Sequence, residues 1–126
     1  MRRFLLGAAL LTALLFFGLW IRAGTDRMLI PISQSLQQAS RQCLSGDLTQ
    51  GQALAEQAQL EWDSVWHYIA SFTDHAPMDE IDSLFGQLES FYAESNTADF
   101  AACCAKLSRL VRAVADTHSP TWWNIL

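Results

Sequence analysis

The sequence predicts an all-α protein, with an N-terminal transmembrane helix followed by a small up-down antiparallel helical bundle. Two observations predict this fold class. Residues 4–21 form an unbroken apolar run in which Thr12 is the only polar side chain. The rest of the chain is rich in Ala, Leu, Gln, Glu and Ser and shows no sustained alternation of apolar and polar positions, which favours helices over strands. We therefore expect an anchor over residues 1–24 and a helical domain over residues 25–126.

The apolar run has the length of a membrane span. As a helix, its eighteen residues measure roughly 27 Å, which is close to the hydrocarbon thickness of a bilayer. The Leu, Phe and Ile side chains in the run favour membrane insertion by roughly 3 to 7 kcal/mol. The run is apolar on every face, whereas a helix of a small soluble protein needs a polar face. We therefore expect this segment to cross the membrane once.

A cleaved signal peptide is the alternative interpretation of the same segment, with Arg2 and Arg3 as its basic start. The apolar stretch is longer than a usual signal core, and Ile21-Arg22-Ala23 lacks the small residues of a cleavage site. We therefore favour an uncleaved signal anchor. Arg2, Arg3 and the α-amine place slightly more positive charge before the span than Arg22 and Arg27 place after it. This difference predicts a cytoplasmic N-terminus and an extracytoplasmic domain at the cell membrane.

Helical spacing of apolar residues predicts four segments in the domain, at about residues 25–44, 47–72, 77–94 and from 97 onward. The first segment is expected to continue directly from the anchor, with a kink at Pro31. Gly46 is expected to end it. Asp47 and Thr97 are the predicted N-caps of the second and fourth helices, and Pro77 suits the first turn of the third. The short connections make neighbouring helices antiparallel.

Each segment carries an apolar stripe that we expect to face the bundle core. The predicted core residues are Met28, Leu29, Ile32, Leu36, Ala39 and Cys43; Leu54, Ala58, Trp62, Val65, Ile69 and Phe72; Ile81, Leu84, Phe85, Leu88, Phe91 and Tyr92; and Phe100, Cys103, Cys104, Leu107, Leu110, Val111 and Val114. Asp79, Glu80 and Asp82 are expected in the first turn of the third helix, where carboxylates complement the positive helix end.

The charges are unevenly distributed along the chain. All thirteen acidic residues lie beyond Ala23, together with only five of the eight basic residues, so this part carries a net charge of −8. Nucleic-acid binders need clustered Lys and Arg, so a nucleic-acid partner is excluded. The same acidic balance disfavours adhesion of the domain to anionic lipid.

No convincing motif for chemistry occurs in the sequence. His67 lies four residues after Asp63 and close to Glu61, a spacing that can share a metal, but a third ligand is missing and a polar helix face explains it. The Asp-His pair at residues 74–75, which precedes an acidic stretch, is explained by a polar loop. His118 has acidic and hydroxyl neighbours in sequence, which does not make a triad. We therefore predict no catalytic, cofactor or metal site and no enzyme activity.

Four Trp residues are candidates for packing or for an interface. Trp62 and Trp66 lie one helical turn apart, and we expect them to pack in the core with their indole N–H groups bonded at its margin; a face that docks a ligand or partner is the alternative. Trp122 and Trp123 lie in an apolar C-terminal tail that we expect to return to the membrane-proximal end of the bundle and cap the core. The alternative for the tail is contact with the lipid interface.

Three Cys residues fall on the predicted core stripes. Cys43 ends the first helix of the domain, and Cys103 and Cys104 begin the fourth, so an up-down bundle places all three at its membrane-distal end. We expect free core thiols, since the number is odd and buried free Cys is a common small core residue. A disulfide between Cys43 and Cys103, or Cys104 instead, is the alternative. It would close a loop of about 60 residues and stabilise the fold by about 4 kcal/mol.

The chain resembles a family of small single-span helical membrane proteins from spore-forming Gram-positive bacteria, described as a domain of unknown function. The resemblance is carried by the residues Trp62 and Trp66, the turn Phe72-Thr73-Asp74-His75, the acidic Asp79-Glu80-Ile81-Asp82 and the closing Asn124-Ile125-Leu126. It implies a membrane-anchored helical protein, and it implies no particular chemistry.

Two functions agree with these observations. The first is a membrane-anchored interaction or scaffold module that binds another protein, and the anchor favours a partner in the membrane. The second is a sensor or ligand-binding bundle with a small apolar site near Trp62 and Trp66. A long apolar cavity lined by Trp62, Phe85 and Phe100 would favour the second function.

Overall fold

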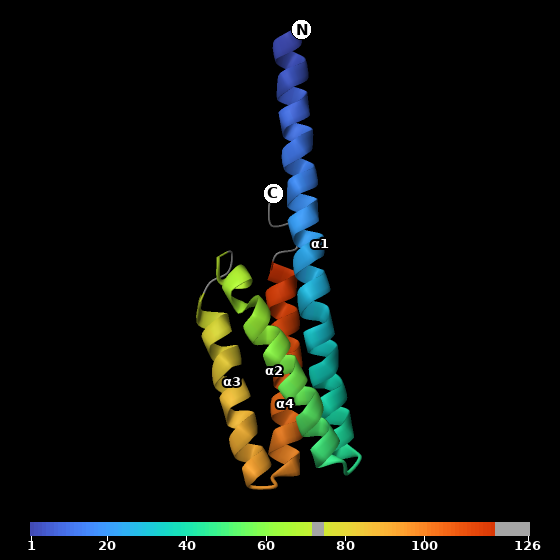
Figure 1. Ribbon diagram of the computed structural model, residues 1–126, viewed down its shortest axis with the longest axis vertical. Helices are drawn as coiled ribbons and strands as arrows, with labels where there is room; N and C mark the ends of the chain where they lie inside the picture. The colour runs from blue at the N-terminus through green and yellow to red at the C-terminus, as the bar shows by residue number, and fades with distance from the viewer. Residues whose placement is uncertain (72–74, 118–126) are drawn as a thin grey trace.

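The computed structural model describes residues 1–71 and 75–117, and these residues form four α-helices. The helices are α1 (Arg2–Leu44), α2 (Leu48–Ala70), α3 (His75–Ala93) and α4 (Thr97–Thr117). No strand occurs in the described residues, so the predicted all-α class is confirmed. Figure 1 shows a rod-like α1 whose second half lies in a bundle with the other three helices and whose first half projects from it.

The projecting half of α1 is the predicted anchor. Arg2–Trp20 is long and apolar enough to cross a membrane, and none of it is buried against the rest of the chain. The helix then continues without a break into the bundle, and Pro31 lies inside it without ending it. The expected direct continuation of anchor into bundle is therefore confirmed, and the structure marks no joint at the predicted boundary near residue 24.

The four helices run up and down, but they do not pack equally against one another. The second half of α1 packs closely against both α2 and α4, and α3 packs mainly against α4. By contrast, α2 and α3 approach each other at few places. The bundle is therefore closed on three sides and looser along its fourth side, which we call the α2–α3 seam.

The observed helix caps agree with the predicted caps in part. Gly46 follows α1 with a φ of 99°, a conformation that favours glycine, and the Asp47 side chain accepts a hydrogen bond from the Gln50 backbone N–H at 3.0 Å, as a cap of α2 should. The prediction of Thr97 as the cap of α4 is wrong. Asn96 performs this function, since its side-chain oxygen accepts from the Asp99 backbone N–H at 3.2 Å.

The acidic residues of α3 lie further along the helix than predicted. This helix begins at His75, two residues earlier than expected, and its first turn holds no acidic residue. Asp79, Glu80 and Asp82 therefore lie in the second turn, where the helix dipole has a weaker effect.

Most of the predicted core is buried, with a few exceptions. Met28 is 40 % exposed, so its assignment to the core was wrong. Leu54, Val65, Phe91, Tyr92 and Leu110 are only half-buried, and Phe72 lies outside the described residues. Buried residues that the apolar stripes did not include are Ser33, Ser40, Gly51, Ala55, Met78, Ala101, Ser108 and Ala115. Most of these are small, and small residues let helices approach each other closely.

The contact between α1 and α4 is built on such small residues. The Ser33 hydroxyl lies 3.0 Å from the Ser108 carbonyl oxygen, and the Ser108 hydroxyl donates to the Ser33 carbonyl oxygen at 2.8 Å. One heptad along, the Ser40 hydroxyl donates to the Ala101 carbonyl oxygen at 2.9 Å. Side chain to backbone bonds across two antiparallel helices require close packing of their backbones, so α1 and α4 form the tight pair of the bundle.

Candidate functional site

The α2–α3 seam is held by one carboxylate that accepts two indole N–H groups. Trp62 and Trp66 lie one turn apart on α2, so both side chains reach toward α3. The Trp62 N–H donates to Asp82 Oδ1 at 2.8 Å, and the Trp66 N–H donates to Asp82 Oδ2 at 3.0 Å. Trp62 is fully buried and Trp66 half-buried. Asp82 therefore satisfies a buried donor and fixes the register of α3 against α2.

A cavity of about 470 Å³, the distal cavity, opens on the part of the seam that lies away from the projecting half of α1. Its apolar lining comes from three helices and includes Ala55, Phe85, Leu88 and Phe100. Polar and acidic side chains of α2 and α3 also line it, namely Gln52, Glu56, Gln59 and Glu89. The cavity exists because α2 and α3 approach each other at few places, so the side chains between them do not close the gap.

A second cavity of about 380 Å³, the proximal cavity, adjoins the first toward the projecting half of α1. Gln59 and Phe85 line both cavities, so the two are continuous neighbours along the seam. The remaining lining of the second cavity is polar and aromatic, from Asp63, Trp66, His67 and Asp82. The Trp66 and His67 rings meet edge to face at 5.3 Å between centroids. The seam thus changes from apolar to acidic and aromatic along its length.

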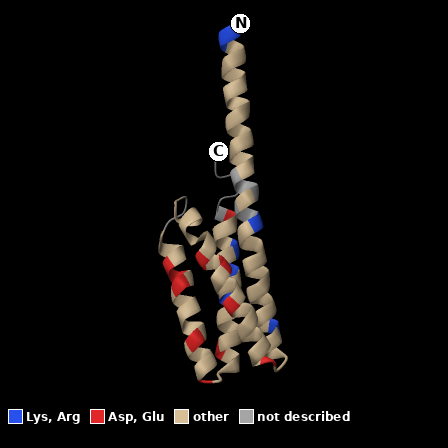
Figure 2. Cartoon of the chain, viewed as in Figure 1, with Lys and Arg blue, Asp and Glu red and all other residues tan. Residues whose placement is uncertain are grey.

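The electrostatic character of the seam is one-sided. Helices α2 and α3 together carry seven carboxylates and no Lys or Arg. The basic residues of the bundle lie on α1 and α4, as Figure 2 shows. Among the described residues, the one ion pair joins Lys106 of α4 to Glu80 of α3 at 3.6 Å. Within the described residues, therefore, no Lys or Arg forms an ion pair with the carboxylates that line the two cavities, and His67 shares the second cavity with Asp63 and Asp82.

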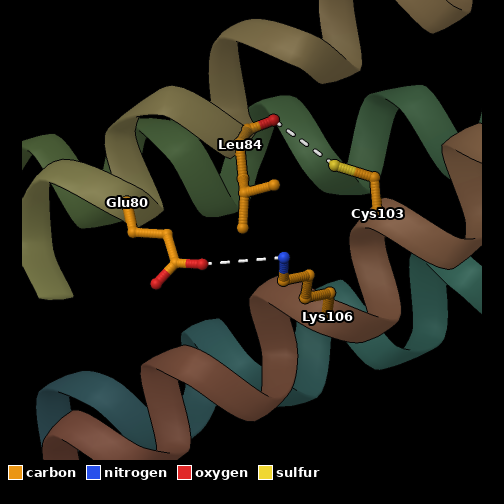
Figure 3. Close-up of polar contacts among 4 residues, drawn as sticks. All are labelled: Glu80, Leu84, Cys103 and Lys106. Carbon is orange, nitrogen blue, oxygen red and sulfur yellow. Dashed lines mark hydrogen bonds and ion pairs between the residues drawn. The ribbon is translucent and has the colours of Figure 1, made fainter.

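The opposite edge of α3 faces α4 and is closed. Figure 3 shows the Lys106 ammonium beside Glu80 and the Cys103 thiol donating to the Leu84 carbonyl oxygen at 3.4 Å. Both members of the ion pair are half exposed, so the pair contributes at most about 1 kcal/mol to stability. These contacts hold α3 against α4, which leaves the other edge of α3 to form the seam.

The three Cys residues are free and buried, so the disulfide between Cys43 and Cys103 that the sequence allowed is not formed. The reason is geometric. Cys103 faces α3 through its bond to Leu84, and it is Cys104, about 100° further round α4, that interacts with Cys43. Burial raises the pKa of all three thiols, and for Cys104 the neighbouring thiols Cys43 and Cys103 add to the increase.

Several other His and acidic residues were weighed in the sequence as parts of a metal or catalytic site. Among the described residues, no group of three His, Cys, Asp or Glu side chains could hold a metal ion. His67 and Asp63 both line the second cavity, while Glu61 lines neither. The remaining candidates, Asp74, His118, Trp122 and Trp123, lie outside the described residues.

Asp82 is the residue of the site that sequence reasoning missed. The sequence analysis placed Asp82 among the acidic residues of the first turn of the third helix. That placement explained the negative charge of Asp82 but identified no hydrogen-bond donor for it. Two Trp residues at i and i+4 followed by an acidic helix carry a usable signal, because a buried indole N–H needs an acceptor. The paired register of α2 and α3 was needed to identify which carboxylate accepts.

A family model described as a domain of unknown function (DUF4363) matches residues 24–125. The match begins close to the predicted boundary between anchor and domain. It covers the second half of α1 and all of α2, α3 and α4, and it leaves out the projecting first half of α1. No curated protein and no solved structure matches the chain.

Proposed function

We propose that this chain, which belongs to the DUF4363 family of domains of unknown function, is a membrane-anchored interaction or scaffold module that binds another membrane protein. The observation that carries the proposal is the continuity of α1, whose apolar first half is fully exposed and whose second half forms part of the bundle core. No loop separates the two halves. The anchor therefore fixes the direction in which the bundle leaves the bilayer, over roughly 36 Å of helix beyond Trp20.

The proposed topology follows from the residues that flank the span. Arg2, Arg3 and the α-amine precede it, so the N-terminus is cytoplasmic and the bundle extracytoplasmic. The resemblance to proteins of spore-forming Gram-positive bacteria agrees with a location at the cell membrane. In this topology the seam opens to the outside of the cell, alongside the external faces of neighbouring membrane proteins.

The seam supports an interaction role. The apolar side chains that line its distal cavity are almost fully buried, with half-buried Tyr92 and exposed Ala93 at the rim. Within the described residues, no Lys or Arg forms an ion pair with the carboxylates beside them. Apolar surface flanked by charge is the usual composition of a protein-binding surface. A rigid anchor adds to this by holding the surface at a defined height, which favours a partner that is itself fixed in the membrane.

The proposal is tested by copurification of the full chain from its native membrane in mild detergent. We expect the chain to resist carbonate extraction and to copurify with one integral membrane protein in fixed ratio. A matched variant, Leu11→Arg with Leu14→Arg, places two charges in the span and should lose both properties, because each charge costs roughly 3 kcal/mol at the centre of a span. Release of the wild-type chain by carbonate would contradict the anchor, and purification without a fixed partner would contradict the binding role.

The alternative function is a bundle that binds a small apolar ligand, and the distal cavity is the observation that favours it. Its volume of about 470 Å³ lies within the range of small-molecule sites. Phe85 and Phe100 line the cavity, as this alternative requires, but fully buried Trp62 does not line it. Native mass spectrometry of the full chain released from detergent distinguishes the two functions, since a retained ligand would favour the alternative.

A further inference from the structure

We infer that the α2–α3 seam is the docking site for a cationic amphipathic helix of a partner protein. This inference rests on the proposed interaction function and names the kind of segment that the interaction surface accepts. Three features of the seam support the inference. They are its shape, the order of apolar and polar residues along its lining, and the sign of its charge.

The shape fits a helix laid along the seam. The lining residues of the two cavities run from Gln52 to His67 on α2, which corresponds to roughly 22 Å of helix length. A partner helix of about four turns covers that length. Almost fully buried Phe85, Leu88 and Phe100 form the apolar floor of the distal cavity, and half-buried Tyr92 and exposed Ala93 lie at its rim. This rim offers a contact for apolar side chains at i, i+3 and i+4 of such a helix, which is the spacing used by helices that bind in grooves.

A helix suits the seam better than an extended segment. The seam lies between two α-helices, whose backbone groups are already paired within each helix. An added strand needs an exposed sheet edge, and the described residues contain no strand. An added helix satisfies its own backbone and needs only side-chain contacts. Its side chains would fill the space between α2 and α3, which do not pack closely against each other.

The charge of the seam selects a cationic partner. Glu56 and Glu89 line the distal cavity from opposite helices, and Asp63 and Asp82 line the proximal one. No Lys or Arg occurs on α2 or α3, and the basic side chains of these two helices are His67 and His75 alone. In the proximal cavity, a cation beside Asp63 can also contact the Trp66 ring face, an added attraction. Acidic helices and anionic lipid would be repelled by the same carboxylates.

The test is photo-crosslinking to the full chain in phosphatidylcholine nanodiscs. Benzoylphenylalanine replaces Ala93, which lines the distal cavity, or, as the control, Ala102. Both alanines are exposed and lie near the membrane-distal end, so the bilayer contributes equally to each. The probes are two biotinylated 18-residue peptides with the same helical Leu pattern, one with Lys and one with Glu at every polar position. Because crosslinking reports contact with the labelled position, peptide bound to lipid alone gives no signal.

We expect the Lys peptide to crosslink at position 93 and not at position 102, and the Glu peptide to crosslink at neither. Adding Glu56→Gln and Glu89→Gln should raise the concentration of Lys peptide that gives half-maximal crosslinking roughly tenfold, because two negative charges at the rim of the cavity are lost. The matched pair Asp79→Asn and Asp116→Asn removes the same charge from exposed positions outside both cavities and should change it little.

Several results would overturn the inference. Equal crosslinking of the Lys and Glu peptides would remove the charge selection, and equal crosslinking at positions 93 and 102 would remove the site. Crosslinks between two copies of the chain at position 93 without peptide would identify a second copy as the occupant. Any of these results leaves the proposed function standing if a membrane protein still copurifies in fixed ratio. Failure of that copurification contradicts the proposed function itself.

Discussion

Asp82 of α3 accepts the indole N–H of fully buried Trp62 of α2 at 2.8 Å, across the side of the bundle where these two helices otherwise approach least. The second oxygen of the same carboxylate accepts from Trp66 at 3.0 Å. One side chain thus links two turns of α2 to α3. We expect this link to set the position of α3 along α2, because the two helices approach each other at few other places.

Replacing Asp82 should therefore destabilise the fold measurably. In Asp82→Ala the N–H of Trp62 is left buried without its acceptor, and we expect a loss of about 2 kcal/mol in the free energy of unfolding. Asp82→Asn keeps one oxygen and should cost less, because only one of the two indoles loses its acceptor. Guanidinium unfolding of the full chain in detergent, followed by far-ultraviolet circular dichroism, measures both effects.

The matched control is Asp79→Ala, an exposed carboxylate one turn earlier on α3. It should change stability by less than about 0.5 kcal/mol, as surface substitutions usually do. If Asp82→Ala behaved like this control, the link between Asp82 and Trp62 would have no stabilising role, and water would have to satisfy the indole.

The sequence allowed the architecture to be predicted, because apolar run length and helical spacing are local properties. It did not reveal the seam. Which helix pairs pack closely depends on small residues such as Ser33, Ser40 and Ser108, and hydroxyl side chains look like surface positions in a pattern based on hydrophobicity. The same lack of pairing information left Asp82 without a partner and left open whether Cys103 or Cys104 faces Cys43.

Gly51 marks a close approach of α1 and α2 and should not tolerate a side chain. A Cβ at this position would overlap the Cys43 sulfur and lie 3.0 Å from the Ala39 carbonyl oxygen. We expect Gly51→Ala to cost roughly 1 to 3 kcal/mol, as overpacking does. Gly86→Ala is the control, since nothing lies within 4 Å of its Cβ, and it should stabilise α3 by roughly 0.5 to 1 kcal/mol. A gain in stability in both variants would contradict the close approach.

Ser33 and Ser108 should behave as a coupled pair. Their hydroxyl oxygens are 2.9 Å apart, and each hydroxyl also reaches the carbonyl oxygen of the other residue. Each single change to Ala removes a partner from a buried hydroxyl and should cost roughly 1 kcal/mol. The double change removes both hydroxyls and should cost less than the sum of the single changes. Additive losses in this double-mutant cycle would show that the hydroxyls act independently.

The thiols should be protected from alkylation in the folded chain. Cys43, Cys103 and Cys104 are buried, and burial raises their pKa values, so little reactive thiolate is present at neutral pH. Iodoacetamide should label none of them in the native protein and all three after unfolding without reductant. Mass spectrometry after unfolding that found only one labelled Cys would establish a disulfide and contradict the free thiols.

The same raised pKa values predict that the fold loses stability in mild alkali. The folded state holds the thiol protons more tightly than the unfolded chain, whose thiols have pKa values near 8.5. The stability contributed by each thiol is therefore complete below about pH 8.5 and declines as the pH rises toward the folded pKa. For Cys104, the most strongly shifted, we expect a loss of about 1.4 kcal/mol between pH 7.5 and 9.5.

Cys104→Ala separates this effect from other titrations. The variant should be less stable than the wild type at pH 7.5, because a buried sulfur is lost, but its stability should fall less steeply up to pH 9.5. Keeping the pH below 10 avoids the titration of Lys and Tyr side chains. The unfolding measurements are made under anaerobic reducing conditions, so that unfolded thiols do not oxidise. If the wild type and the variant lost stability equally between pH 7.5 and 9.5, Cys104 would not be the group that releases its proton on unfolding.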